Sequence, residues 1–412
     1  MKPLSLYPFL ALLVLFSFGA RSSDLPPLRV GDQPGYTRVV LDLPKDATFQ
    51  IEPLGAALRV TLPGLTLTPG ISFVSQPELA GYVLEQHEGK AVVLLMTPQG
   101  VSERSGFRAQ VLPALQGEGR RLVIDLSGGF VDTTPLSAPP GFAFVKAQGR
   151  RFSVLLDPGH GGAFFPGAVG FVTEKVVNLE VALRVRRLLE AAGVEVAMTR
   201  ETDTAFSPVL RTDLDQRARM ADGRSLFVSI HANAITPARA DGWAGQEVYY
   251  YSPRDQRPVY VAPQPLTPSQ AQPVALTTPA VPPSAEPLPA DLAQPAPLDP
   301  GNPQPATEEP LPRQALPQPT PQMDSARRVE LSRRLAGRVM GYLLGATAAA
   351  NRGVRTADFY VIRYTTVPAI LVEMGYVSHP LEGPALRDPN YQDRLAHGIA
   401  RGVLEFLEND LE

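Results

Sequence analysis

The 412-residue sequence contains no cysteine at all. This absence excludes a disulfide framework and a lipid-modified cysteine, and it leaves only nitrogen and oxygen atoms as ligands for any metal. A strong charge of one sign is also missing, because the formal net charge is −3. With no zinc-finger or phosphate-loop pattern either, we expect no nucleic-acid partner.

The apolar run at the N-terminus, Phe9 to Phe18, is too short for a transmembrane helix, which needs about 20 residues. Lys2 precedes this run, and the small residues Gly19 and Ala20 follow it, as in a secretory signal peptide. We therefore predict a signal peptide at residues 1–22 and export to the periplasm or cell envelope, with no stable membrane span after cleavage. A retained membrane anchor is the alternative interpretation.

The distribution of proline divides the rest of the chain. A length of 412 residues is too long for one ordinary domain, and 44% hydrophobic residues allow sizeable cores. The segment from Pro253 to Gln322 carries 21 of the 44 prolines, with few aromatic residues between them. Such a segment cannot build a core, so we predict an extended, partly polyproline-II insertion at 253–322. The chain re-enters the domain at Asp324, which is predicted to cap a helix.

The first half of the chain consists of short segments with alternating polar and apolar residues. The clearest ones lie at 36–43, 58–62, 91–95 and 121–126. They predict a small all-β sandwich at residues 25–132, followed by a linker at 133–150. Because this region lacks a compelling cluster of acids, histidines or nucleophiles, we favour binding over catalysis, with a spacer role as the alternative.

Four residues of the second half have the chemistry of a metal hydrolase. His160, Glu174 and His231 offer two imidazoles and one carboxylate, a set that leaves the fourth position of a tetrahedral zinc ion open to water. An open position is typical of a catalytic site. Glu373, a carboxylate outside this ligand set, is the expected base, because amide hydrolysis needs a group that takes the proton of water and passes it to the amine.

The placement of these residues agrees with one site. His160, His231 and Glu373 follow apolar segments that predict buried strands, at 152–156, 226–230 and 369–372. Ligands of open α/β sheets gather at the carboxyl ends of strands. Glu174 opens a segment with helical spacing that ends at Gly193, and a carboxylate is favourable at a helix N-terminus. We predict an α/β catalytic domain at 151–412, with a twisted, mostly parallel sheet flanked by helices.

Each of these features also has a simpler interpretation. A single histidine at a strand end is more often structural than a metal ligand. The glycines around His160 could permit a tight turn or cradle phosphate, but no Lys-Ser or Lys-Thr pair follows them. Among other polar residues, we predict bracing roles for Arg217 and Asn233, a solvated or structural role for Glu247, structural roles for His379 and His397, and a surface position for His87.

An ordered set of motifs resembles the zinc-dependent N-acetylmuramoyl-L-alanine amidases, the amidase 3 family. In sequence order, the motifs are Asp-Pro-Gly-His-Gly-Gly at 157–162, 166–179, 199–203, 214–217, Ser-Ile-His-Ala-Asn-Ala at 229–234 and Leu-Val-Glu-Met-Gly-Tyr at 371–376. Two positions depart from the pattern, since Asp222 stands where Asn is usual and His379 where Asn is common. Neither departure touches a proposed ligand.

This resemblance implies that His160, Glu174 and His231 bind Zn²⁺ and that Glu373 is the catalytic base. It also implies the substrate, the amide bond between N-acetylmuramic acid and L-alanine in peptidoglycan, and a role in cell-wall remodelling and daughter-cell separation. Another zinc peptidase acting on stem peptides, or a non-catalytic wall-binding regulator, is the alternative.

A weaker resemblance concerns the first half of the chain. The segments 37–43 and 120–126 are similar to strands of the AMIN domain, a module that binds or localises to peptidoglycan. In related amidases, the region of the insertion can hold a regulatory segment over the active site. The resemblance to the amidase 3 family therefore also implies a possible activator protein that acts on the catalytic domain.

Overall fold

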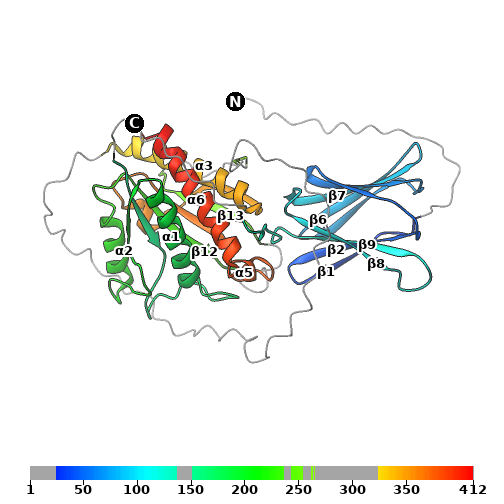
Figure 1. Cartoon of the computed structure of the whole chain (residues 1–412), viewed down its shortest axis with the longest axis horizontal. Coiled ribbons are helices and arrows are strands. Elements are labelled where there is room, and N and C mark those ends of the chain that lie inside the picture. The colour runs from blue at the N-terminus through cyan, green and yellow to red at the C-terminus, as the bar shows by residue number, and fades with distance from the viewer. Residues whose placement is uncertain are drawn as a thin grey trace.

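The computed structural model describes residues 25–136, 151–235, 243–253, 261–262, 264 and 323–411. The predicted signal peptide and most of the predicted linker and insertion lie outside these residues. No helix within the described ranges is long and apolar enough to cross a membrane. The described chain forms an all-β part and an α/β part (Figure 1).

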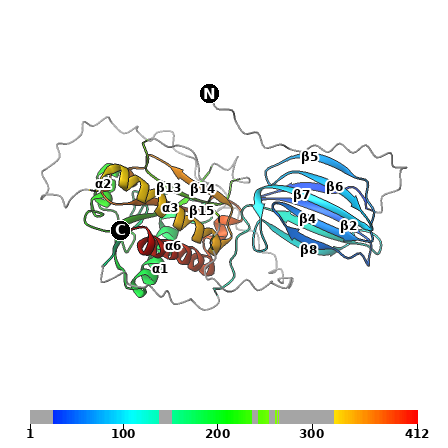
Figure 2. The same ribbon diagram turned by 90° about the horizontal axis from the view of Figure 1, so that it is seen from above.

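The all-β part consists of two antiparallel sheets. One contains β1 (Arg29–Gln33), β2 (Tyr36–Leu43), β9 (Arg120–Leu126) and β8 (Phe107–Pro113), in this spatial order. The other contains β3 (Gln50–Pro53), β4 (Gly55–Pro63), β7 (Lys90–Val101), β6 (Leu79–His87) and β5 (Gly70–Gln76), again in spatial order. Figure 2 shows these strands from above.

One apolar core joins the two sheets. Leu41 of β2 and Ile124 of β9 meet Leu58 of β4 and Val93 of β7 in a single buried cluster. Along β2, every second residue is buried, which is the period of a strand with one face in a core. The prediction of a small β-sandwich is therefore confirmed.

The α/β part is built on a six-stranded sheet. Its strands, in spatial order, are β11 (Glu195–Met198), β10 (Ser153–Pro158), β12 (Leu226–Asn233), β15 (Ala369–Tyr376), β13 (Gln246–Tyr250) and β14 (Asn351–Thr356). The first four strands run parallel to one another, and β13 is antiparallel to β15 and parallel to β14. This confirms the prediction of a mostly parallel sheet.

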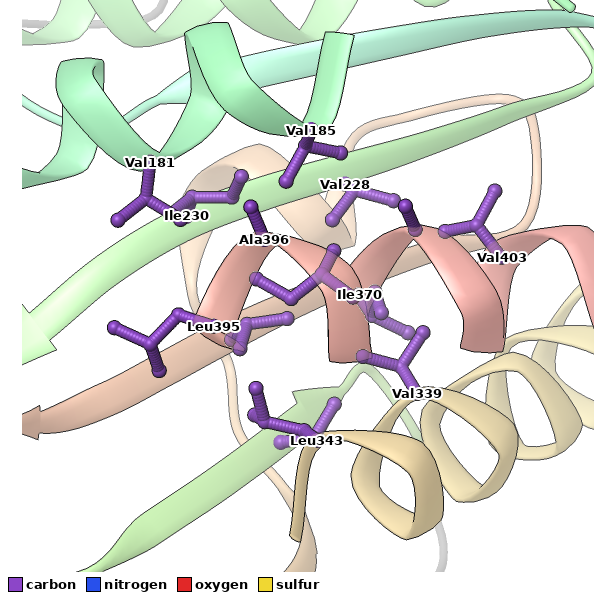
Figure 3. Close-up of a cluster of buried hydrophobic side chains, with 14 of the residues drawn as sticks. Val181, Val185, Val228, Ile230, Val339, Leu343, Ile370, Leu395, Ala396 and Val403 are labelled. Atoms are coloured by element: carbon purple, nitrogen blue, oxygen red, sulfur yellow. The ribbon is translucent and has the colours of Figure 1, made fainter. Parts of the chain in front are cut away.

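Helices cover both faces of this sheet, because alternate residues of each strand point to opposite sides. Apolar residues of α1 (Glu174–Ala191), α3 (Ser325–Thr347) and α6 (Pro389–Asn409) pack on one face around Val228 and Ile370 (Figure 3). On the other face, α4 (Tyr360–Arg363) packs against Phe227 and Leu371, beside α2 (Leu210–Arg219). The short α5 (Glu382–Ala385) follows β15.

The predicted helix starts agree with the structure, but two strand ends do not. Asp324 accepts hydrogen bonds from the backbone nitrogens of Ala326 and Arg327, each at 3.1 Å, and so caps α3 as expected. Strands β12 and β15 continue beyond His231 and Glu373. These two residues therefore lie inside their strands, because backbone pairing continues where the apolar run ends.

The two parts of the molecule are in contact. Asp132, which follows the sandwich, lies 3.2 Å from the Arg394 guanidinium of α6 and donates its backbone N–H to the carbonyl of Thr347. His379 is buried against Gly129, where a Cβ atom would overlap its ring. His397 is also buried, whereas the His87 side chain is 61% exposed. All three histidines agree with the roles predicted for them.

Candidate metal and catalytic site

Three predicted ligands meet at one point. His160 lies in the loop after β10, Glu174 is the first residue of α1, and His231 lies in β12; one potential ligand atom from each falls within 4.8 Å of the others. The Glu174 Oε1 atom is 3.2 Å from His160 Nε2 and 2.9 Å from His231 Nδ1. The two imidazole rings stand nearly perpendicular, with centroids 4.9 Å apart.

The loop that carries His160 is held in a costly conformation. His160 has a φ angle of 63°, a left-handed conformation that residues with a side chain rarely adopt. A Cβ atom on Gly159 would overlap the ring of His231, and one on Gly167 would lie 2.5 Å from Glu174 Oε2. Gly159 and Gly167 therefore allow the backbone to approach the imidazole and the carboxylate closely.

A buried ionic network supports the same loop. The Arg217 guanidinium lies 2.8 Å from Asp157 Oδ1 and 2.6 Å from Asp213 Oδ2, and it donates a 2.8 Å hydrogen bond to the carbonyl of His160. The hydroxyl of Ser229 donates to Asp157 at 2.7 Å. Burial alone would raise the pKa of Asp157, but the positive charge of Arg217 and the hydrogen bonds from the Thr199 and Ser229 hydroxyls together outweigh it and lower this pKa. The bracing position predicted for Arg217 is thus observed. For Asn233, no hydrogen bond donated by its side chain to another described residue supports this role.

Glu373 stands next to the three clustered residues. It pairs with His231 in the parallel register of β12 and β15. Its side chain borders the pocket, while its Oε2 atom is buried and has no hydrogen-bond partner among the described residues. Burial raises the pKa of the Glu373 carboxyl well above its ordinary value, and the neighbouring carboxylates of Glu174 and Glu247 raise it further.

Glu247 extends this row of side chains across a third strand. It pairs with Glu373 in the antiparallel register of β13 and β15 and is buried. Arg352 lies 2.6 Å from its carboxylate, and the hydroxyls of Tyr249 and Tyr376 donate to it. The solvated alternative for Glu247 is therefore wrong, and the structural one agrees with these contacts. The signal in the sequence was a lone carboxylate within an otherwise uncharged strand.

The site opens into a pocket of about 330 Å³. Its lining includes the three clustered residues and Glu373. It also includes the largely apolar side chains of Leu210 and Leu214 from α2 and of Phe359 and Tyr360 at the start of α4. Such an enclosure holds a small ligand with a few polar groups directed at it. The contribution of α4 to the pocket was not predicted from the sequence, because a four-residue helix is too short to show a helical period.

Comparisons with known proteins identify the family of the α/β part. The model of the family described as N-acetylmuramoyl-L-alanine amidase matches residues 154–405. The germination-specific N-acetylmuramoyl-L-alanine amidase of Bacillus subtilis (strain 168) is 27% identical over 264 residues, which cover 62% of this chain and 79% of that protein. The N-acetylmuramoyl-L-alanine amidase AmiC of Neisseria meningitidis is 30% identical over 269 residues, 64% of this chain and 55% of that protein.

Among solved structures, the N-acetylmuramoyl-L-alanine amidase AmiC2 of Nostoc punctiforme is 27% identical, with a TM-score of 0.39 over 63% of this chain and 98% of that one. The match to the Neisseria relative spans only about half of that protein, at 55%. The family match begins inside β10, so it includes His160, Glu174, His231 and Glu373 and leaves the β-sandwich outside.

Proposed function

Because the chain belongs to the N-acetylmuramoyl-L-alanine amidase family, we propose that it is a zinc hydrolase that cleaves the amide bond between N-acetylmuramic acid and L-alanine in peptidoglycan. The observation that carries this proposal is the convergence of His160, Glu174 and His231 within 4.8 Å, with Glu373 on the adjacent strand. The intact set of four argues against a non-catalytic wall-binding regulator.

The proposed ligands fit a zinc ion. Ligand atoms bound to tetrahedral zinc at about 2.0–2.2 Å stand roughly 3.3 Å apart. The distances from Glu174 Oε1 to the imidazole nitrogens, 3.2 Å and 2.9 Å, are close to this separation. Two nitrogens and one oxygen also form a ligand set that zinc accepts, and such a set would leave a position for water. When bound, zinc would lower the pKa of a water molecule to about 7 and polarise the scissile carbonyl.

The protein groups around this centre divide the remaining work. Glu373 would take the proton of the attacking water and return it to the amine of L-alanine as the bond breaks. Arg217 would hold the His160 loop in place through its carbonyl. The apolar wall that includes Leu214 and Phe359 would exclude water from the substrate and orient it.

We extend the proposal to the whole chain as follows. Residues 1–22 would direct export, residues 25–132 would bind the cell wall as an AMIN-like domain, and residues 151–412 would form the catalytic domain, with the insertion at 253–322. This arrangement suits an enzyme of cell-wall remodelling and daughter-cell separation. The proposed activator protein would act on the catalytic domain.

Mass spectrometry of peptidoglycan digested by the protein in the presence of zinc would identify the bond that is cleaved. We expect stem peptides with a free N-terminal L-alanine, and we expect none with a chelator or with Glu373→Ala. A matched control is Glu190→Ala, which removes an exposed carboxylate from the last turn of α1. Cleavage elsewhere in the stem peptide would contradict the amidase assignment and favour a zinc peptidase.

Zinc content separates the ligands from the base. His160→Ala and His231→Ala should lose the ion, because two ligands hold zinc poorly, whereas Glu373→Ala should keep close to one zinc per chain while being inactive. The measurement is elemental analysis after dialysis against trace zinc. If Glu373→Ala lost zinc as completely as His160→Ala, its assignment as the base would be wrong.

A further inference from the structure

An exposed cation lies next to two residues that line the pocket. Leu210 of α2 and Tyr360 of α4 line the pocket, and Arg211 follows Leu210. The Arg211 guanidinium carbon lies 4.4 Å from the centroid of the Tyr360 ring and 5.8 Å from that of Tyr364. Arg211 therefore stands on a pair of aromatic rings at the edge of the active-site pocket.

The Arg211 side chain is held in place but not neutralised. It is 65% exposed, and its ion partner Asp215 lies at 3.8 Å, a distance at which an exposed pair contributes little. Asp215 also accepts the hydrogen bond of the Tyr360 hydroxyl, so its charge is shared. A guanidinium packed on a ring keeps its N–H donors at its edges, where they can bind a carboxylate with two hydrogen bonds.

Other cations close to the pocket are already engaged. Lys175 lies 2.6 Å from Asp203 and donates to the carbonyl of Gly162. Arg217 is buried in its ion pairs with two aspartates. Arg211, by contrast, is exposed beside two residues that line the pocket and is accessible to an anionic group.

We propose that Arg211, supported by Tyr360, binds the carboxylate of the second residue of the stem peptide and so determines a preference for acidic peptides. This inference rests on the proposed function. On the amine side of the scissile bond, the second residue follows L-alanine by a Cα–Cα step of about 3.8 Å. Its α-carboxylate is therefore the negative charge of the stem peptide that lies nearest to the scissile bond. A pocket of about 330 Å³ is at the small end for ligand sites, which leaves this group at the rim.

Two muramyl peptides that differ in one group test the proposal. Both carry L-alanine followed by γ-linked D-glutamate, whose α-carboxylate is free in one peptide and amidated in the other. For the unchanged protein with zinc, we expect kcat/KM to be about tenfold higher for the free carboxylate, the size typical of one charge-assisted contact. The difference should lie in KM, because the carboxylate is remote from the reacting bond.

Variants of one helix supply the controls. Arg211→Ala should lower kcat/KM about tenfold for the acidic peptide and leave the amidated peptide unaffected, while Arg211→Lys should retain part of the preference. Arg219→Ala removes the same charge from an exposed position at the other end of α2 and should behave like the unchanged protein. Zinc content and the emission of Trp243 verify that each variant is folded.

The outcomes separate this proposal from the one on which it rests. If the unchanged protein cleaves both peptides and Arg211→Ala lowers both rates equally, or neither, the subsite is wrong and the amidase stands. An equal loss in Arg219→Ala would also contradict the subsite, because the effect would then be one of general charge. If the unchanged protein cleaves neither peptide at the muramyl bond, both proposals fail.

Discussion

The β-sandwich and the α/β part differ in what they bury. Within the described residues of the first part, up to residue 136, the buried charged side chains are Glu78 and Asp132. The α/β part buries many more, namely Asp157, Glu174, Arg200, Asp213, Arg217, Glu247, Glu382 and Arg394. A buried charge is costly unless it is paired. The sandwich is held together mainly by apolar residues, whereas in the α/β part the paired charges of Asp157, Asp213 and Arg217 support the loop of His160.

The largest expected effect comes from removing the cation of the network below the site. Arg217→Met leaves Asp157 and Asp213 buried without a counter-charge, which should cost about 3–5 kcal/mol of the free energy of unfolding. The measurement is urea unfolding followed by the fluorescence of Trp243, the only tryptophan, which lies in the α/β part.

Arg224→Met is the matched control for this experiment, because Arg224 pairs with Glu195 at the surface, at 2.7 Å. It should change stability by less than about 1 kcal/mol. Equal losses of unfolding free energy in the two variants would show that the buried network stabilises the protein no more than a surface pair does. Burial of charge would then not distinguish the two parts energetically.

A smaller effect is expected from a cavity in the sandwich. Leu58→Ala removes buried methyl groups from the shared core of the two sheets and should cost about 2–5 kcal/mol. Far-UV circular dichroism reports on the strands, and Trp243 reports on the other part. We expect the midpoint of the Trp243 transition to stay unchanged, because Leu58 belongs to the sandwich core alone. A parallel shift would mean that the contact of Asp132 with Arg394 couples the parts into one cooperative unit.

The same contrast explains how much of the fold was predictable. The alternation in β2 and the helical spacing after Glu174 predicted both elements with correct starts, because one face of each is buried in an apolar core. Several elements were not predicted, and β14 and α4 show why. Strand β14 is largely polar at the edge of its sheet, and α4 has only four residues.

The candidate site was predictable in its residues but not in its arrangement. His231 and Glu373 could be predicted as site residues because each directly follows an apolar run. Their pairing across β12 and β15, and the position of Glu247 beside them, depend on strand order, which no local pattern contains. The Arg217 network has the same origin, since its partner Asp157 lies far away in the sequence.

Glu78 is an exception within the sandwich, and its removal should stabilise the protein. Burial raises the pKa of Glu78 from 4.5 to about 7, although the backbone N–H of Gly128 donates to it. The folded state therefore binds the proton more tightly than the unfolded state, and stability falls as the pH rises from about 4.5 to 7. Glu78→Gln removes this cost and keeps an oxygen for Gly128, so it should gain up to about 3 kcal/mol at pH 8.

The gain should vanish at pH 4, where Glu78 is protonated in both states. Thermal unfolding by circular dichroism at the two pH values measures it, with Glu85→Gln, an exposed neighbour in β6, as the control. A gain that did not depend on pH would indicate better packing of the amide and not the loss of a buried charge.

The smallest effect is expected for an ion pair on the sandwich surface that has the same contact distance as the buried pair below the site. Arg59 lies 2.8 Å from Glu52 on the sandwich, the same distance that separates Arg217 from Asp157. The Arg59 and Glu52 side chains are 41% and 58% exposed, so water solvates both charges when the pair is broken. Arg59→Ala should therefore cost less than about 0.5 kcal/mol in urea unfolding followed by circular dichroism, and added salt should reduce even this loss. Because the two pairs have equal distances, a cost near that of Arg217→Met would show that contact geometry, and not burial, determines the strength of an ion pair in this protein.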